Sequence, residues 1–377
     1  MKRLALAGCI TLLAACSHSD AFAPHDTSRS GPLVAGTPAR LTYTPAASVT
    51  PAWLPDASAF AYGFSDLEAR LDHDQCIGIM PAAGGSLTAR ICNVNPFSGD
   101  STDTFAWPAV SPNGTRLAYL RSSRPRAAQT DQRSTLVVAP LAAPASFTPV
   151  RSLPFQGGDG TLYVSLADLS WLGPEQLVML GEQDNSVSCP DPPACTEDPV
   201  LVRSGRRVLV ATLAPGAPTV VDVLGTDWAS SVAPVSGSTD IYYTVAGASQ
   251  VYRAPLTGGG SVVHDFGAEG IARDVDAAGN LLVAVAGGVL RLLDDGSGAP
   301  LQQDFGGRLF VVNLAAGTSA ELAIPATVFR HPAIAPDGSS VVAEGYALTI
   351  TRFTSGGVQF VDTAVTGVPT LWRFPLQ

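Results

Sequence analysis

Few residues in this sequence have the type and spacing that catalysis needs. Lys2 is the only lysine, so Schiff-base chemistry and a phosphate-loop lysine are excluded from the rest of the chain. No Gly-x-Ser-x-Gly elbow presents a nucleophilic serine, and no phosphate loop or dinucleotide fingerprint is recognisable. We therefore expect no cofactor and no enzyme activity. Carboxylate pairs that meet only in the folded chain escape such a search.

Metal-binding patterns are also weak. Residues 72–74 and 274–276 each carry two aspartates that could contribute to a calcium site, but neither run has the spacing of a calcium-binding loop. The histidines lie in separate contexts, without metal-ligand spacing. They are His18, His25, His73, His264 and His331. We expect no metal site.

The N-terminus has the features of an export signal. Lys2 and Arg3 precede an apolar run over 4–15 that is too short to span a bilayer comfortably. The run ends in Leu-Ala-Ala-Cys at 13–16, which resembles a bacterial lipobox, and this resemblance implies that Cys16 is lipidated. Ser17 follows where an aspartate would suggest inner-membrane retention, so we expect the outer membrane. The alternative is an ordinary signal peptide in which Cys16 is incidental.

These features divide the chain into three parts: a signal peptide (1–15), a polar, flexible tether (16–38) and a folded part (39–377). The formal net charge of −10 argues against nucleic acid or an anionic membrane surface as a partner. Membrane contact is expected through the lipid anchor only.

The folded part contains an internal repeat. Pro-Ala-Trp-Leu-Pro-Asp at 51–56 recurs as Pro-Ala-Val-Ser-Pro-Asn at 108–113 and as Pro-Ala-Ile-Ala-Pro-Asp at 332–337. Weaker copies begin at Leu169, Val232 and Arg273. Each copy predicts a strand, a tight turn set by proline and aspartate or glycine, and a second strand.

Two further strands complete each unit. Apolar third strands such as 76–81 follow every copy, and fourth strands are expected at 86–92, 147–153, 219–224, 261–266 and 319–324. The sixth fourth strand is missing at the C-terminus, but residues 40–43 stand directly before the first copy, where a fourth strand belongs. We predict an all-β, six-bladed β-propeller with four antiparallel strands per blade, whose last blade is closed by the N-terminal strand at about 40–44. A seven-bladed or split arrangement is the main alternative.

The repeats resemble the WD40-like repeat of TolB-type propellers over roughly residues 40–377. The likeness is strong in units one, two and six and degenerate in the others. TolB-type propellers are periplasmic interaction modules, so the resemblance implies protein binding. The chain departs from TolB because it has no room for TolB's N-terminal domain and because TolB has no lipid anchor.

Four cysteines remain for disulfides in an oxidising compartment. Cys76 opens a third strand and Cys92 ends the following fourth strand, so we expect the two to face each other across the hairpin. Cys189 and Cys195 are expected to close a proline-rich loop.

Most of the extra chain length lies in the connections between second and third strands, on one face of the ring. These connections cover about 63–75, 121–134, 181–200, 286–307 and 345–369. Long loops on a rigid scaffold often bind partners, although insertions there are also tolerated cheaply. Arg121, Arg124 and Arg126 in one of them could meet an acidic partner or glycan, or could simply be solvated.

The residue before each repeat copy should point towards the same face as the long connections, near the central channel. These residues are Thr50, Trp107, Asp168, Ser231, Ala272 and His331. Arg273 and Arg330 are close to them in sequence. The alternative is that Trp107 packs between blades and His331 is an ordinary surface residue.

Two functions fit these patterns. The first is a non-catalytic lipoprotein of the cell envelope that binds a protein partner through its long-loop face. The second is a binder, hydrolase or lyase of extracellular glycans at the channel mouth around Trp107, Arg273 and His331, where an aromatic ring near arginines suits sugar stacking and carboxylate pairing.

Overall fold

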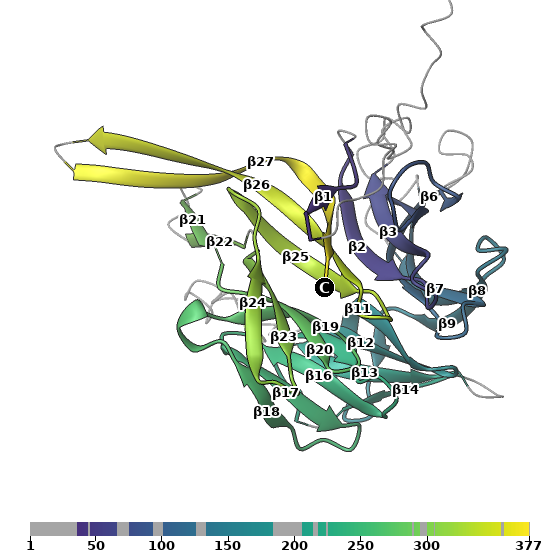
Figure 1. Cartoon of the computed structure of the whole chain (residues 1–377). Coiled ribbons are helices and arrows are strands. Elements are labelled where there is room, and N and C mark those ends of the chain that lie inside the picture. Colours follow the sequence, from purple (N-terminus) through teal and green to yellow (C-terminus); the bar gives the residue numbers. More distant parts are fainter. Residues whose placement is uncertain are drawn as a thin grey trace, which may run out of the picture.

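The computed structural model shows six β-sheets arranged in a ring (Figure 1). The described residues are 36–43, 46–65, 75–92, 101–125, 133–183, 206–213, 218–223, 225–288, 290–294, 300–304, 306–355 and 358–376. The signal peptide with Cys16 and most of the tether lie outside them, as do Arg126, Cys189 and Cys195. Among the described residues, no helix is long and apolar enough to cross a membrane.

The first three blades follow one another along the chain. Blade 1 comprises β2 (Ser48–Trp53), β3 (Ala59–Ser65), β4 (Gln75–Pro81) and β5 (Ala89–Ile91). Blade 2 comprises β6 (Ser101–Val110), β7 (Arg116–Pro125), β8 (Arg133–Pro140) and β9 (Thr148–Ser152). Blade 3 comprises β11 (Leu162–Gly173), β12 (Gln176–Gln183), β13 (Arg206–Thr212) and β14 (Thr219–Asp222), with the short β10 (Phe155–Gln156) added beside β11.

The other three blades complete the ring. Blade 4 comprises β15 (Ala229–Pro234), β16 (Asp240–Val245), β17 (Gln250–Pro255) and β18 (Ser261–Asp265). Blade 5 comprises β19 (Ala272–Ala278), β20 (Leu281–Ala286), β23 (Arg308–Asn313) and β24 (Thr318–Leu322). Blade 6 comprises β25 (Thr327–Ile334), β26 (Ser340–Ser355), β27 (Val358–Pro375) and the N-terminal β1 (Ala39–Arg40).

The N-terminal strand closes the ring, as the sequence predicts. Ala39 and Arg40 pair antiparallel with Arg373 and Trp372 of β27. Leu41 donates its backbone N–H to the Leu371 carbonyl at 2.8 Å, and Thr42 Oγ1 accepts the Leu371 N–H at 2.9 Å. The predicted six-bladed, four-stranded architecture is confirmed.

Each blade packs against both of its neighbours, which explains the apolar sequence of the second and third strands. The described residues form six hydrophobic clusters, one at each interface between adjacent blades. In β3, Phe60 and Tyr62 pack towards blade 6, whereas Ala59 and Ala61 pack towards blade 2. A strand buried on both faces needs apolar residues at every position rather than at alternate ones.

Two tryptophans tie inner strands of adjacent blades together. Trp53 Nε1 donates to the Ala333 carbonyl at 3.0 Å, and Trp171 Nε1 donates to the Ala109 carbonyl at 2.9 Å. Both indole rings are buried. These tryptophans therefore have a structural role at the interfaces of blades 1 and 6 and of blades 2 and 3.

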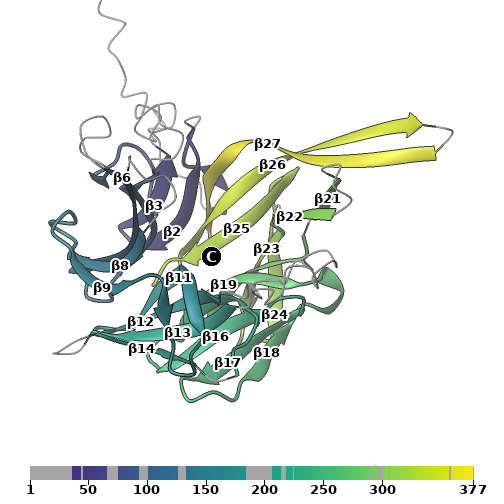
Figure 2. The same ribbon diagram turned by 180° about the vertical axis from the view of Figure 1, so that it is seen from behind.

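Two long connections that we predicted as loops contain regular strands. The connection in blade 5 contains a ribbon of β21 (Leu290–Asp294) and β22 (Pro300–Asp304). In blade 6 the strands β26 and β27 continue as one hairpin far beyond the ring (Figures 1 and 2). Pairing of β-branched and aromatic residues across these strands gives the segment regular structure that a loop assignment missed.

One of the two expected disulfides is present. Cys76 in β4 and Cys92 after β5 are bonded, with a Cα–Cα distance of 4.6 Å. Cys76 is fully buried in the cluster between blades 1 and 6.

Candidate functional site

A β-bulge interrupts the inner strand of every blade at a similar height in the channel. In four blades the bulge places a residue other than glycine at positive φ: Thr50 (49°), Trp107 (54°), Asp168 (55°) and His331 (40°). Such backbone costs about 1–3 kcal/mol per residue and persists only where the surroundings enforce it. The repeat thus builds the same strained feature four times around the channel.

The bulge residues line a cavity of about 520 Å³ that receives residues from the inner strands of all six blades. Thr50, Trp107, Asp168, Ser231 and His331 line it, as the sequence predicts. The cavity extends to the tight turns between first and second strands, where Ser236, Gly237 and Pro336 are exposed. It therefore reaches the surface on the face opposite to the long connections.

The prediction for blade 5 was wrong. Asp274 lines the cavity, whereas Ala272 is fully buried between blades 4 and 5. The turn after β19 is shorter than in blade 1, because Ala278 and Leu281 pair directly around Gly279 and Asn280. When the repeat copy in blade 5 is aligned with the others by its second strand, its first strand is therefore placed two residues too early.

Channel side chains bind the backbone of the next blade. Asp168 Oδ2 accepts hydrogen bonds from Ser231 Oγ at 2.6 Å and from the Val232 N–H at 2.7 Å. Ser231 Oγ accepts the Val275 N–H at 3.0 Å. Blades 3, 4 and 5 are thus joined by a continuous chain of hydrogen bonds along the channel wall.

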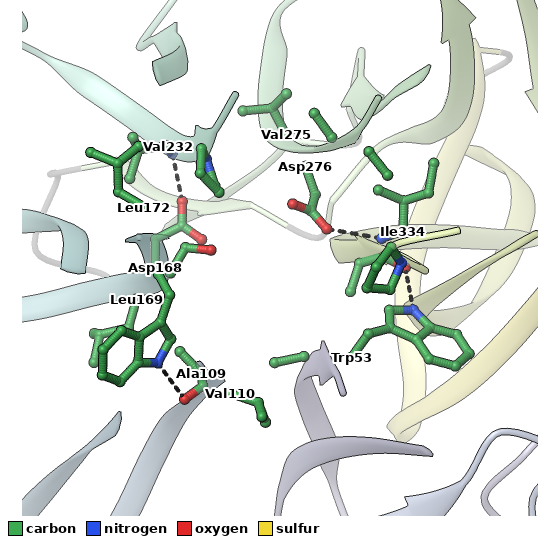
Figure 3. Close-up of a pocket in the computed structure, with 18 of the residues that line it drawn as sticks. Trp53, Ala109, Val110, Asp168, Leu169, Leu172, Val232, Val275, Asp276 and Ile334 are labelled. Carbon is green, nitrogen blue, oxygen red and sulfur yellow. Dashed lines mark hydrogen bonds between the residues drawn. The ribbon is translucent and has the colours of Figure 1, made fainter. Parts of the chain in front are cut away.

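Blade 5 is joined to blade 6 in the same way. Asp274 Oδ2 accepts the His331 N–H at 3.0 Å, and Asp276 Oδ2 accepts the Ile334 N–H at 2.9 Å (Figure 3). Asp274 and Asp276 are two residues apart on β19, so both carboxyl groups lie on the channel side of the strand. Asp276 is a cavity residue that the channel prediction did not include.

His331 is the centre of a cluster that reaches back to blade 1. His331 Nδ1 lies 2.7 Å from Glu344 Oε1, which also accepts the Thr50 N–H at 2.6 Å. Tyr346 donates its hydroxyl to Glu344 Oε2 at 2.9 Å. The rings of Trp107 and His331 meet edge to face, with their centroids 4.9 Å apart. His331 is therefore a bonded member of the channel wall, and Trp107 packs against it.

The environment divides the carboxyl groups into two kinds. Burial raises the pKa of Asp168 to about 6 and that of Asp276 to about 7. For Asp274 and Glu344, burial acts in the same direction, but it is outweighed by the positive charges of His331 and Arg330, which lower both pKa values. In turn, Glu344 and Asp274 overcome the effect of burial on His331 and raise its pKa.

Arg273 and Arg330 do not line the cavity. Arg330 Nε lies 3.9 Å from Asp274 Oδ2, and Arg273 Nε donates to the Gly287 carbonyl at 2.6 Å. Both arginines therefore bind wall residues of the channel, and only Trp107 and His331 of the predicted glycan-site residues line this cavity.

Of the three arginines predicted in the connection of blade 2, only Arg121 has a side chain within the described residues. Arg121 pairs with Asp103 at 2.7 Å and lies over the Phe147 ring, both within its own blade. Arg124 belongs to β7, but its side chain lies outside the described residues, as does the whole of Arg126.

Neither of the weak calcium motifs is supported as a metal site. Residues 72–74 lie outside the described residues. In the part of the chain that the structure describes, no group of three or more histidine, cysteine, aspartate or glutamate side chains could hold a metal ion.

Comparison with known proteins shows only distant likenesses. No protein-family model matches the chain, and no curated protein is similar to it. TolB from Acinetobacter baumannii is 13% identical with a TM-score of 0.45, over 88% of this chain and 63% of TolB. A nidogen/laminin complex is 11% identical with a TM-score of 0.42, over 74% of this chain and 80% of that chain. Oligogalacturonate lyase from Vibrio parahaemolyticus is 10% identical with a TM-score of 0.44, over 92% of this chain and 96% of that chain. The chain spans less than two thirds of the length of that TolB. The propeller assignment rests on the strand topology of the chain itself, and these likenesses carry no argument about what it does.

Proposed function

We propose that this chain is a non-catalytic scaffold of the bacterial cell envelope that binds a protein partner through the face carrying the long connections. The observation that supports this function most directly is the hairpin of β26 and β27. Six residue pairs, from Ile350 with Thr363 to Ser355 with Val358, continue beyond the contacts of β26 with β25 and its preceding turn. At about 3.3 Å per residue this part of the hairpin is about 20 Å long.

A two-stranded ribbon of this length is an unusual structure to leave in water. An isolated hairpin is marginally stable, and the outer edges of such a hairpin can pair with strands of other chains. Proteins commonly protect such edges with charges, but the only charged residues of segment 346–367 are Arg352 and Asp362. A protein partner that adds a strand along the outer part of the hairpin would extend its backbone hydrogen bonding.

The proposed location follows from the N-terminal sequence. The apolar run over 4–15 and the lipobox-like 13–16 favour export and a lipid anchor on Cys16. An anchor of this kind would place the propeller at the outer membrane, where its partner would be another envelope protein.

The test is to remove the hairpin without disturbing the ring. In the variant, residues 348–365 are replaced by Asn-Gly, which favours a tight turn between paired strands. The anchored wild type and the variant are captured from cross-linked envelopes of the native cell. We expect a stoichiometric protein to co-purify with the wild type and to be lost from the variant.

A control variant carries Thr239→Arg on an exposed tight turn of the opposite face. It should keep the partner. Retention of the same protein at the same stoichiometry by the hairpin-free variant would contradict the proposed binding face.

A further inference from the structure

The channel cavity is a second candidate site, and it is independent of the hairpin. Its walls combine polar side chains with proline and alanine side chains, of which Pro51, Ala52, Pro108, Ala109, Pro332 and Ala333 are examples. Asp168 of blade 3 and Asp276 of blade 5 point their carboxyl groups into the same space (Figure 3). A cavity of about 520 Å³ in which polar groups converge beside apolar proline and alanine side chains is typical of a small-molecule site.

Within the part of the chain that the structure describes, the two carboxyl groups have hydrogen bonds but make no ion pair. Among the described residues, Asp168 bonds only to Ser231 and Val232, and Asp276 makes no ion pair. Both bonds of Asp168 use Oδ2, which leaves Oδ1 for a ligand. In the described part of the lining, His331 is the one side chain that can carry positive charge, and Glu344 already holds it.

We propose that the channel cavity binds a small organic cation, whose ammonium group lies between Asp168 and Asp276 and whose carbon chain lies against the proline and alanine walls. An ammonium group donates several hydrogen bonds and neutralises carboxylates that are costly to keep charged away from water. The carboxyl groups of Asp168 and Asp276 in the cavity would repel an anion. A metal ion would need more ligands than the described residues bring together.

Protons compete with such a ligand, because the cation prefers both carboxyl groups ionised. The charged groups around the pair are Asp274 on β19, Arg330 and His331 on β25, and Glu344 on β26. Asp274 and Glu344 have lowered pKa values and stay ionised. Loss of the proton from His331 at higher pH removes a positive charge and favours the ligand further. Affinity should therefore rise with pH between about 5.5 and 8.

Calorimetric titration with diaminobutane tests the proposal, with butanediol as the uncharged molecule of similar shape. We expect the diamine to bind at pH 8, to bind about tenfold or more weakly at pH 5.5, and the diol not to bind. The double variant Asp168→Asn, Asp276→Asn should lose the affinity. Asp56→Asn, which removes one charge from an exposed turn, should keep it.

Three results would overturn the proposal. The diamine does not bind the wild type at pH 8. Alternatively, it binds the double variant equally well, which would indicate general attraction to an acidic chain. The third result is that Ca²⁺ binds more tightly than the diamine and depends on the same two aspartates, which would assign the cavity to a metal. A thermal melt of each variant, with a cooperative transition, separates loss of the site from loss of the fold.

Discussion

Burial in the channel wall destabilises the charged form of Asp276. Burial raises its pKa to about 7, well above the value of about 4 in an unfolded chain. The folded state therefore holds a proton that the unfolded state releases, so stability falls as pH rises from about 4 to about 7 and stays reduced above that range. Asp276→Asn keeps an acceptor for the Ile334 N–H but carries no charge. At pH 8 we expect it to raise the free energy of unfolding by about 1–3 kcal/mol, a range reduced because water reaches the cavity.

Urea unfolding at pH 8 and at pH 4 measures this effect. The gain should disappear at pH 4, where the wild-type aspartate is already protonated in the folded state. Asp56→Asn should give no gain at either pH, because hydrogen bonds from Ser58 lower the pKa of this exposed carboxyl group and so favour its charged form. An Asp276→Asn variant that is less stable than wild type at pH 8 would show that favourable interactions of the charged Asp276 outweigh the cost of its burial.

Thr50 combines two unfavourable features at one position. Its φ is 49°, which a β-branched residue rarely adopts, and its buried Oγ1 has no hydrogen-bond partner. Thr50→Gly removes both and keeps the Thr50 N–H bond to Glu344. After the entropy cost of glycine, we expect a gain of about 1 kcal/mol in unfolding free energy. Thr50→Ala removes the hydroxyl and the γ-methyl group but keeps a Cβ at positive φ, so a gain equal to that of glycine would show that the backbone is not strained.

The sequence identified channel residues where the repeat was intact and missed them where it was not. Trp107 and His331 precede clear copies of the motif, so their place in the channel followed from the pattern. Asp276 stands in a degenerate copy whose shortened turn shifts the register. Glu344 lies on a second strand, outside the rule that was applied. Its signal was a lone carboxylate directly after the apolar run 341–343, since a buried charge requires a partner.

At the scale of the strand, the inner edges of the blades depend on tryptophan. Trp171 is buried, donates to the Ala109 carbonyl and lies beneath the Arg116 guanidinium, which also pairs with Glu175. Trp171→Phe keeps most of the apolar area but removes the indole hydrogen bond to the Ala109 carbonyl. We expect a loss of about 1–2 kcal/mol in urea unfolding. Trp228→Phe is the matched control, because Trp228 is 45% exposed and its indole makes no hydrogen bond in the structure. Equal losses for the two variants would contradict a specific role for the Trp171 bond.

The strands of the ring were predictable, but the ribbons attached to it were only partly so. Proline, aspartate and glycine mark the tight turns, and burial on two faces makes the second and third strands uniformly apolar. Segment 345–369 carries no repeat motif, so it was predicted as a loop. Its alternating threonines, valines and phenylalanines around Gly356 and Gly357 were the available signal of a hairpin. What a ribbon contacts is decided by other chains, and no pattern within this sequence contains that information.

At the scale of the molecule, each blade is held by its two neighbours, so the ring has no weak boundary as long as it is closed. Six interface clusters of similar construction share the stability. The joint in blade 6 differs from the others because it unites the two ends of the chain. There, the N-terminal segment is held to β27 by the two residues of β1 and by the adjacent Leu41 and Thr42. The ring should therefore open first at this joint.

Leu41→Ala tests this expectation. Leu41 is 2% exposed and belongs to the cluster between blades 1 and 6, so its truncation should cost about 2–4 kcal/mol. Val251→Ala truncates an equally buried side chain inside blade 4. If the joint is the site of local opening, native-state hydrogen exchange in Leu41→Ala should accelerate at Leu371 and Arg373 of β27 more than the global loss of stability explains. In Val251→Ala those amides should change only with global stability. Identical exchange patterns in the two variants would mean that the propeller unfolds as one cooperative unit, and that the N-terminal strand closes the ring without being its point of opening.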